Sequence, residues 1–360
     1  MKVAFRTDAT SQIGTGHFMR CLTLADALKQ RGVHTRFISR GLPSHLRDML
    51  TSKNISLVSL DNNATTSIID ELAHSHWLGV SQAQDAQETL QALSDRSWDW
   101  LVVDHYALDA RWESVLRGTA KKILVVDDIA DRLHDCDVLL DQNFYTDMQT
   151  RYIGKIPPHC QLLLGPHYAL LRDEFRQLRE QVQPRTGAVK RILVFFGGVD
   201  ADNYTGRVVD VLSEMRISDL QVDVVIGTQH PCRIEIETQC AEQGYSCHVQ
   251  TNRMAELMAI ADLAIGAGGS ATLERCSMGL PSIIFVLAAN QSKAAKDLDM
   301  AGVLINLGDF RQVSNKVLAD RINELIGNEK LRSELSSSSL KLVSLSRQNN
   351  IAEIMVDHNA

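Results

Sequence analysis

Short apolar, β-rich runs alternate along the whole chain with longer segments whose apolar residues recur at helical spacing. This alternation constrains the fold most, because strands that alternate with helices form parallel sheets covered by helices. We therefore expect an α/β protein. In the first half, strands are expected at residues 2–6, 35–39, 100–103, 123–126 and 138–140, and in the second half at 222–226, 247–250, 263–266 and 282–285.

The plan of the opening residues occurs a second time in the chain. A buried strand, a glycine-rich turn and a helix are expected at the N-terminus, and RILVFFGGVDADNYT, residues 191–205, repeats that order. Ligands of open α/β sheets bind at the carboxyl ends of the strands. We therefore expect two Rossmann-like domains that face each other across a cleft.

The segment at residues 175–191 separates these two halves. It is charged, poor in apolar residues and broken by Pro184 and Gly187, which is typical of an interdomain linker. The expected domains are residues 1–178 and 190–335. Residues 336–360 are expected as a tail, which can be helical and can return to the first domain, with its serine-rich part as a mobile connection.

Composition excludes several classes of function. The 360 residues suffice for two domains, and the net charge of −7 gives no basic surface for nucleic acid. Seven scattered cysteines without a C-x-x-C pair indicate neither a disulfide framework nor a zinc site, and fit a reducing cytoplasm. No apolar run approaches the ~20 residues of a membrane span. We expect a cytoplasmic protein without membrane, metal or cofactor.

The turn I-G-T-G-H is the first candidate site. Gly14 and Gly16 allow a ligand close to the backbone, and the helix that follows offers unpaired N–H groups. The partial positive charge of the helix N-terminus favours a neutral His17, as a general base requires. The alternative is that His17 caps the helix or packs under the loop. The turn is no dinucleotide fingerprint, since G-x-G-x-x-G would need glycine at Met19.

A second glycine-rich turn, GAGGSATLE, begins at residue 266 after an apolar strand. Gly268, Gly269 and Ser270 can offer backbone and hydroxyl donors to phosphate, and Glu274, one helical turn later, can accept from the two hydroxyls of a ribose. Helix capping is the alternative. After the next strand come the amides of Asn290 and Gln291, where a sugar would lie.

Three further clusters are less specific. In FFGGVDADN, Gly197 and Gly198 allow close approach, and Asp200 either caps the next helix or contacts substrate. Asp104, His105 and Tyr106 end one strand, and Asp127 and Asp128 end the next, positions that suit either a site or a turn. For His74 and His76 a surface or interdomain role is favoured over a metal site.

Seven blocks, in order from residue 5 to residue 291, resemble one family: FRTDATSQIGTGHFMRCLTLADALKQRG, HWLGVSQAQDAQET, WLVVDHYALDARWE, VVDDIADRLHDCDVLLDQNF, LLGPHYALLRDEF, FFGGVDADNYT and IGAGGSATLERCSMGLPSIIFVLAANQ. Together they are similar to the UDP-2,4-diacetamido-2,4,6-trideoxy-β-L-altropyranose hydrolases of pseudaminic acid synthesis. The resemblance covers most of the chain.

This resemblance implies a GT-B fold, like that of the enzyme that adds N-acetylglucosamine in peptidoglycan assembly. It implies hydrolysis of the UDP-sugar with inversion and without a metal or cofactor, with His17 as the base. It further implies that Gly268, Gly269, Ser270 and Glu274 hold UDP, that Asn290 and Gln291 reach the substrate and that Tyr106 lines the sugar side, with Asn143 in D-Q-N as a further contact. Gly14 and Gly16 are expected to give the substrate room at the backbone, and Gly197 and Gly198 are expected to do the same in the second domain.

Two alternatives remain at this point. An inverting glycosyltransferase would share the fold and the UDP site but pass the sugar to an acceptor, and a nucleotide-sugar binding protein would use His17 only as a cap. The expected partner is a small UDP-sugar, and the expected oligomeric state is a monomer. The expected role is in flagellin glycosylation or surface polysaccharide synthesis.

Overall fold

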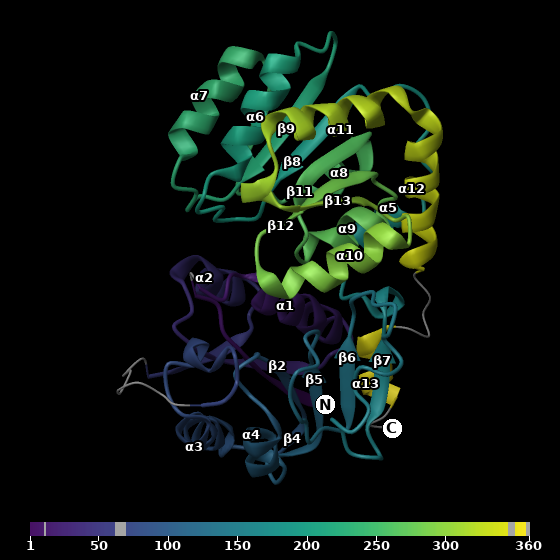
Figure 1. The fold of residues 1–360 in the computed structure, drawn as a ribbon. Coiled ribbons are helices and arrows are strands. Elements are labelled where there is room, and N and C mark those ends of the chain that lie inside the picture. The colour runs from purple at the N-terminus through teal and green to yellow at the C-terminus, as the bar shows by residue number, and fades with distance from the viewer. Residues whose placement is uncertain (11, 62–69, 345–349, 358–360) are drawn as a thin grey trace. The chain divides into compact units, whose positions relative to one another are not determined.

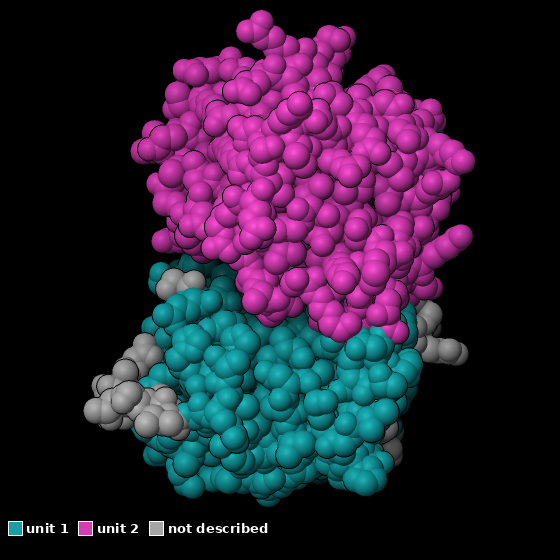
Figure 2. All heavy atoms as spheres, viewed as in Figure 1, with its two compact units in different colours: residues 1–143, 147–170, 346–360 teal, residues 144–146, 171–345 magenta. Residues whose placement is uncertain are grey.

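A computed structural model describes residues 1–10, 12–61, 70–344 and 350–357. The chain divides into two compact units (Figure 2). Unit 1 consists of Met1–Asn143, Asp147–Leu170 and Ser346–Ala360, and unit 2 of Phe144–Thr146 and Leu171–Leu345.

Unit 1 is built on a parallel sheet of seven strands in the order β3-β2-β1-β4-β5-β6-β7 (Figure 1). The strands are β1 (Lys2–Thr7), β2 (His34–Arg40), β3 (Ser56–Leu60), β4 (Trp98–Asp104), β5 (Ala120–Val126), β6 (Val138–Asp141) and β7 (Gln161–Leu164). The helices are α1 (Gly16–Lys29), α2 (Ser44–Ser52), α3 (Gln82–Leu93), α4 (Ala110–Leu116) and α13 (Ile351–Asp357), with short 3-10 helices η1 (Ser75–Trp77) and η2 (Pro166–Tyr168).

Helices cover both faces of this sheet, which explains the runs of consecutive apolar residues in its central strands β1, β4, β5 and β6. Val3 and Phe5 of β1 face α1, α2 and α13, whereas Ala4 faces the side covered by α3 and α4. The last helix is anchored in the first of these cores, since Met355 is fully buried and its carbonyl accepts a hydrogen bond from the indole of Trp100.

Unit 2 has a parallel sheet of six strands in the order β10-β9-β8-β11-β12-β13. The strands are β8 (Arg191–Phe195), β9 (Gln221–Ile226), β10 (Ser246–Val249), β11 (Leu263–Ala267), β12 (Ser282–Val286) and β13 (Ile305–Asp309). The helices are α5 (Asp173–Arg179), α6 (Tyr204–Met215), α7 (Arg233–Gln243), α8 (Met254–Ile260), α9 (Ala271–Ser277), α10 (Ser292–Met300), α11 (Asn315–Gly327) and α12 (Glu329–Leu342), with η3 (Ala289–Gln291) and η4 (Phe310–Gln312).

The expected fold class is confirmed, and every expected strand is present. Three strands escaped the sequence analysis: β3 and β13, in which most side chains are only partly buried or exposed, and β7, which is four residues long. The segment expected as a linker contains most of α5, which packs against α8 and α9.

Most of the serine-rich segment is helical, and its last residues, 345 and 346, lie outside the described part of the chain. The helical part forms the second half of α12, where the hydroxyl of Ser336 donates to the carbonyl of Gly279 and that of Ser339 to the carbonyl of Val303. Both serines are buried, and these two hydrogen bonds to backbone carbonyls satisfy their hydroxyl groups inside the protein.

Each sheet has one place where the strand order reverses. In unit 1 the chain runs outward from β1 through β2 to β3 and then returns to add β4 on the other side of β1, and in unit 2 β11 adds beside β8 in the same way. Loops at the carboxyl ends of two such strands diverge to opposite faces and leave room for a ligand. The G-x-G-H turn follows β1 and the glycine-rich turn at residue 268 follows β11, so both predicted loops lie at these positions.

Candidate functional site

The turn between β1 and α1 places His17 at a helix N-terminus. Gly14 has φ of 75°, a left-handed conformation that glycine adopts without strain, and its N–H donates to the carbonyl of Thr10 at 2.8 Å. Helix α1 begins at Gly16, so His17 is its second residue. The side chain of His17 is 9% exposed.

His17 is paired with a carboxylate from the neighbouring strand. Its Nδ1 lies 2.6 Å from Oδ1 of Asp104, the last residue of β4. Arg20 and His17 hold the pKa of Asp104 well below its usual range, although burial opposes this. Because an ionised carboxylate only accepts hydrogen bonds, Nδ1 carries the proton of this contact and Nε2 keeps its lone pair in the neutral ring. Nη2 of Arg20 lies 3.2 Å from the same Nδ1, but it donates to Asp104 at 2.7 Å, so the shorter contact with the carboxylate decides the tautomer. The side chain is thus held by Asp104 and does not cap the helix.

Arg20, one turn further along α1, fixes Asp104 in place. Its Nε donates to Oδ2 of Asp104 at 2.6 Å and its Nη2 to Oδ1 at 2.7 Å, the bidentate geometry of a strong ion pair. The third guanidinium nitrogen, Nη1, donates to Oδ2 of Asp128 at 2.9 Å. The sequence analysis missed Arg20, and its spacing of three residues from His17 on the predicted helix was the available signal.

Tyr106 and Asn143, both predicted at the substrate, meet at Asp128. The hydroxyl of Tyr106 donates to Oδ1 of Asp128, and Nδ2 of Asn143 lies 3.1 Å from its Oδ2. Burial raises the pKa of Tyr106 well above its usual range, so the phenol keeps its proton and remains a donor. The ring of Tyr106 stands edge-on to that of His17, with centroids 4.5 Å apart. Asp128 therefore contacts two of the residues that were predicted at the substrate.

His74 also lies here and is partly buried. Its ring centroid is 4.6 Å from that of Trp77 and 5.2 Å from that of Tyr106. His76 is exposed, and its ring is edge-on to that of Trp77 at 6.3 Å. Both histidines of the H-x-H pair therefore contact Trp77.

His105 points away from this group, although it lies between two site residues in the sequence. It is 2% exposed, and its Nε2 lies 3.2 Å from Oδ2 of Asp8. Asp8 is in turn paired with Arg6, which also binds Asp85 from α3. His105 is therefore part of a buried charged network that holds the loop after β1.

In unit 2, the loop after β8 contains Gly197, with φ of 109°, and Gly198. Asp200 in this loop accepts hydrogen bonds from the backbone N–H groups of Tyr204 and Thr205 and from the hydroxyl of Thr205. Both carboxylate oxygens are thus used at the start of α6. Of the two roles left open for Asp200, the structure shows capping.

The loop after β11 brings together residues predicted to bind UDP. The N–H of Gly268 donates to the carbonyl of Phe285, and Ser270, at the start of α9, makes no side-chain cap bond. A Cβ added at Gly269 would lie 3.6 Å from Nε2 of Gln291, so these two residues are neighbours. Asn290, beside Gln291 in η3, is exposed.

Glu274 lies on α9 and is paired with Arg172, which the sequence analysis did not select. Nε of Arg172 donates to Oε1 of Glu274 at 3.0 Å. Burial raises the pKa of Glu274, and the positive charge of Arg172 opposes this shift. No hydrogen bond is found for Oε2 of Glu274 among the described residues, which leaves this oxygen to accept from a ligand.

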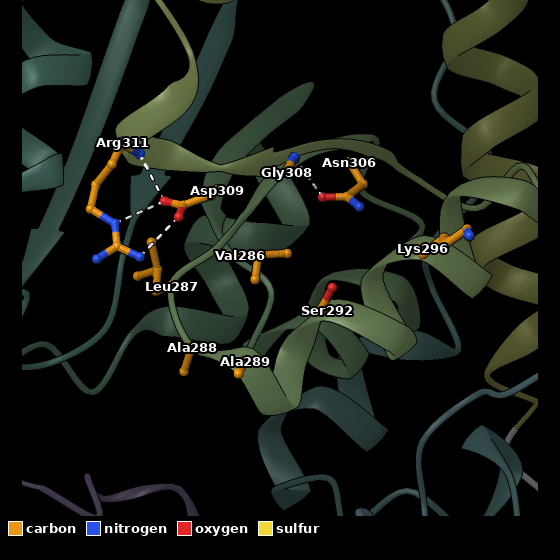
Figure 3. Close-up of a pocket in the computed structure, with 10 residues that line it drawn as sticks. All are labelled: Val286, Leu287, Ala288, Ala289, Ser292, Lys296, Asn306, Gly308, Asp309 and Arg311. Carbon is orange, nitrogen blue, oxygen red and sulfur yellow. Dashed lines mark hydrogen bonds and ion pairs between the residues drawn. The ribbon is translucent and has the colours of Figure 1, made fainter.

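A pocket of about 480 Å³ lies near this loop, within unit 2 (Figure 3). It is lined by Val286, Leu287, Ala288, Ala289, Ser292, Lys296, Asn306, Gly308, Asp309 and Arg311. None of these is a predicted site residue, but Ala289 and Ser292 flank the predicted Asn290 and Gln291 in the chain. Asp309 forms an ion pair with Arg311 at its rim.

Within the described parts of the chain, no three His, Cys, Asp or Glu side chains come together as a metal site. Nor does any described helix have the length and apolar content to cross a membrane.

Comparison with known proteins relates the chain to enzymes of nucleotide-sugar chemistry. Residues 191–357 match the glycosyltransferase family 28 C-terminal domain. The chain is 28% identical over 218 residues to the UDP-2,4-diacetamido-2,4,6-trideoxy-β-L-altropyranose hydrolase of Campylobacter jejuni, covering 60% of this chain and 68% of that protein. It is 23% identical to the spore coat polysaccharide biosynthesis protein SpsG of Bacillus subtilis, covering 95% and 94% of the two chains.

Solved structures show the same fold at lower sequence identity. MurG of Acinetobacter baumannii superposes with a TM-score of 0.65 at 16% identity, covering 99% of both chains. The spinosyn rhamnosyltransferase SpnG in complex with thymidine diphosphate gives 0.66 at 15% identity and covers both chains completely. The chain therefore has the GT-B fold of the glycosyltransferases, and its resemblance to the UDP-2,4-diacetamido-2,4,6-trideoxy-β-L-altropyranose hydrolase, inferred from sequence motifs, is confirmed.

Proposed function

We propose that this protein hydrolyses UDP-2,4-diacetamido-2,4,6-trideoxy-β-L-altropyranose. The products are UDP and free 2,4-diacetamido-2,4,6-trideoxy-L-altrose, a precursor for pseudaminic acid. The observation that carries the proposal is the 2.6 Å contact between Nδ1 of His17 and Asp104, in a turn that resembles the base-bearing turn of the hydrolases. The named relative at 28% identity supports the substrate.

In the proposed reaction His17 acts as the general base. Its Nε2 takes a proton from water while the water oxygen attacks the anomeric carbon from the face opposite UDP. The bond from that carbon to the diphosphate oxygen breaks, and its electron pair leaves with UDP. A single displacement inverts the anomeric centre. Asp104 accepts from Nδ1–H throughout and stabilises the positive charge that the ring gains, as carboxylates do beside basic histidines.

UDP is proposed to bind through unit 2. The backbone N–H groups and hydroxyl of Gly268–Ser270 suit a diphosphate, and the unpaired Oε2 of Glu274 suits ribose hydroxyls. Gly197 and Gly198 would allow close approach to the phosphates, and the amides of Asn290 and Gln291 suit polar groups of the substrate. UDP is a good leaving group, so these donors suffice without an added acid.

An inverting glycosyltransferase is the second candidate, favoured by the family 28 match and by the glycosyltransferases among the solved structures. The two candidates differ in what attacks the anomeric carbon. Release of free sugar from the UDP-sugar in buffer alone supports the hydrolase, whereas turnover that requires an added acceptor supports the glycosyltransferase.

The test compares wild type with His17→Leu and with His34→Leu as the matched control, because His34 is exposed on the same unit at the start of β2. NMR spectra would follow the substrate and the anomer first released, and calorimetry would measure UDP affinity. We expect His17→Leu to lose turnover while its UDP affinity and the activity of His34→Leu stay unchanged. Normal turnover by His17→Leu would refute the assignment of the base, and release of the retained anomer would refute direct attack by one water.

A further inference from the structure

Five rings form a continuous aromatic cluster at the candidate base, with His76 at its edge, where its ring is edge-on to that of Trp77 at 6.3 Å. Trp77 stacks on Tyr106 with centroids 5.5 Å apart and planes 24° from parallel, and its ring is edge-on to that of His17 at 6.1 Å. His74 contacts both Trp77 and Tyr106. Trp77 lies in η1 and His74 immediately precedes it, so one short stretch of chain supplies both of these rings.

Trp77 differs from the other tryptophans of the chain in its exposure. Trp98, Trp100 and Trp112 are 2%, 0% and 1% exposed, whereas Trp77 is only half-buried. A tryptophan that keeps part of a large apolar ring in water beside a polar site is typical of a binding surface.

The outer part of this cluster carries no charge at neutral pH. Burial lowers the pKa of His74 below its usual value, so this ring is neutral at pH 7. The phenol of Tyr106 keeps its proton, and indole does not titrate. An uncharged aromatic wall offers nothing to a diphosphate, which needs N–H donors and cations. It suits the C–H groups and methyl substituents of a sugar.

The geometry points to Trp77 as a specificity-determining residue that packs against the apolar substituents of the sugar, with His74 and Tyr106 holding its ring. This inference rests on the proposed function. The ligand class is a UDP-linked deoxy sugar with N-acetyl groups, whose C6 and acetamido methyls give more apolar surface than a fully hydroxylated hexose has. Trp77 therefore favours such sugars over UDP-glucose and UDP-N-acetylglucosamine.

Trp77 itself is the probe for the test. The His17→Leu variant would be titrated with UDP, UDP-glucose and the UDP-diacetamido-trideoxy sugar, so that no turnover disturbs the measurement. We expect a change in tryptophan fluorescence with the diacetamido sugar and none with UDP, because the three other tryptophans are buried. Saturation-transfer NMR with irradiation of aromatic protons should mark the C6 and acetamido methyls most strongly.

Two variants of Trp77 separate its contribution to sugar affinity from its fluorescence signal. Trp77→Phe keeps a ring, so it should keep most of the sugar affinity and lose the fluorescence change. Trp77→Ala should weaken binding of the diacetamido sugar about tenfold, as for the loss of one aromatic contact and its buried area. UDP affinity should be unchanged in both, and His34→Ala, at the exposed start of β2, is the control.

The outcomes also separate this inference from the proposed function. Tight binding of the diacetamido sugar with no fluorescence change and no effect of Trp77→Ala overturns the role of Trp77 alone. Absence of binding by any UDP-sugar to wild type overturns the proposed function, and the role of Trp77 with it.

Discussion

Oδ1 of Asp104, the last residue of β4, accepts the Nδ1 proton of His17, which lies in the helix after β1. The strands β1 and β4 are far apart in sequence and adjacent in the sheet. The pairing of β1 with β4 places Thr7 opposite Asp104, so the loop after β1 and the end of β4 open at the same place. The contact between His17 and Asp104 therefore depends on the point where the strand order of unit 1 reverses.

Removing the charge of Asp104 should impair the base without removing it. In Asp104→Asn the side chain can donate a proton to Nδ1, which favours the tautomer with its proton on Nε2 and leaves no lone pair for water. We expect kcat for UDP-sugar hydrolysis to fall about 10²–10⁴-fold, the range that general bases contribute. Steady-state kinetics with a UDP-binding measurement would check this.

The matched control is Asp99→Asn, at the other end of the same strand, where the carboxylate pairs with Lys121 at the surface. Its kcat should be that of wild type. Equal kcat in Asp104→Asn and Asp99→Asn would show that Asp104 does not orient the base.

The sequence predicted part of this site and missed the rest for a physical reason. His17 was selected from its glycine-rich turn, Tyr106 from its place at a strand end, and Asn143 from the family resemblance. Arg20 and Trp77 were missed because their roles come from contacts across the fold, such as that of Arg20 with Asp128, 108 residues away. A single sequence carries no signal for pairs at such separation.

UDP binding should depend on Glu274 and not on the other carboxylate that shares its arginine. Arg172 pairs with both Glu274 and Glu174. We expect Glu274→Ala to raise the Kd of UDP about tenfold or more, as for the loss of hydrogen bonds to a charged group. Glu174→Ala should leave it unchanged, and calorimetry would measure both. The same Kd in both variants would remove Glu274 from the proposed ribose site.

Stability should fall between pH 6 and pH 8 because of one buried carboxyl. Burial, together with the nearby charge of Asp128, raises the pKa of Asp141 to about 8, against about 3.9 in an unfolded chain. Between these values the folded state binds one proton more than the unfolded state. The free energy of unfolding therefore decreases with rising pH, by up to about 1.4 kcal/mol per pH unit from this group.

The isosteric Asp141→Asn should lose this contribution, while its Oδ1 can still accept from the N–H of Asn143. Although burial opposes it, Glu113 raises the pKa of His134 to about 9, so a second decrease above pH 6.5 remains in both proteins. Urea unfolding at pH 6 and pH 8 should show the smaller decrease in the variant. Equal decreases would contradict a protonated Asp141.

The fold was predictable where strands are buried on both sides and follow a helix with a clear apolar face. The strands at the sheet edges were harder to predict. Because β3 and β13 have only one neighbouring strand, many of their side chains reach solvent, so polar residues interrupt the apolar run that would indicate a strand. The charged composition of residues 175–191 indicated a linker, although Phe175 is fully buried and anchors α5.

The packing of α13 has a consequence for dissecting the protein. Met355 and its neighbours complete the core of unit 1. A fragment that stops at Leu170 would therefore leave apolar core residues in contact with water and the indole N–H of Trp100 without its acceptor. To express unit 1 alone, the residues of α13 would have to be joined to the fragment by a designed connection, as in a circular permutant. The first 170 residues are therefore not, by themselves, an independently folding part.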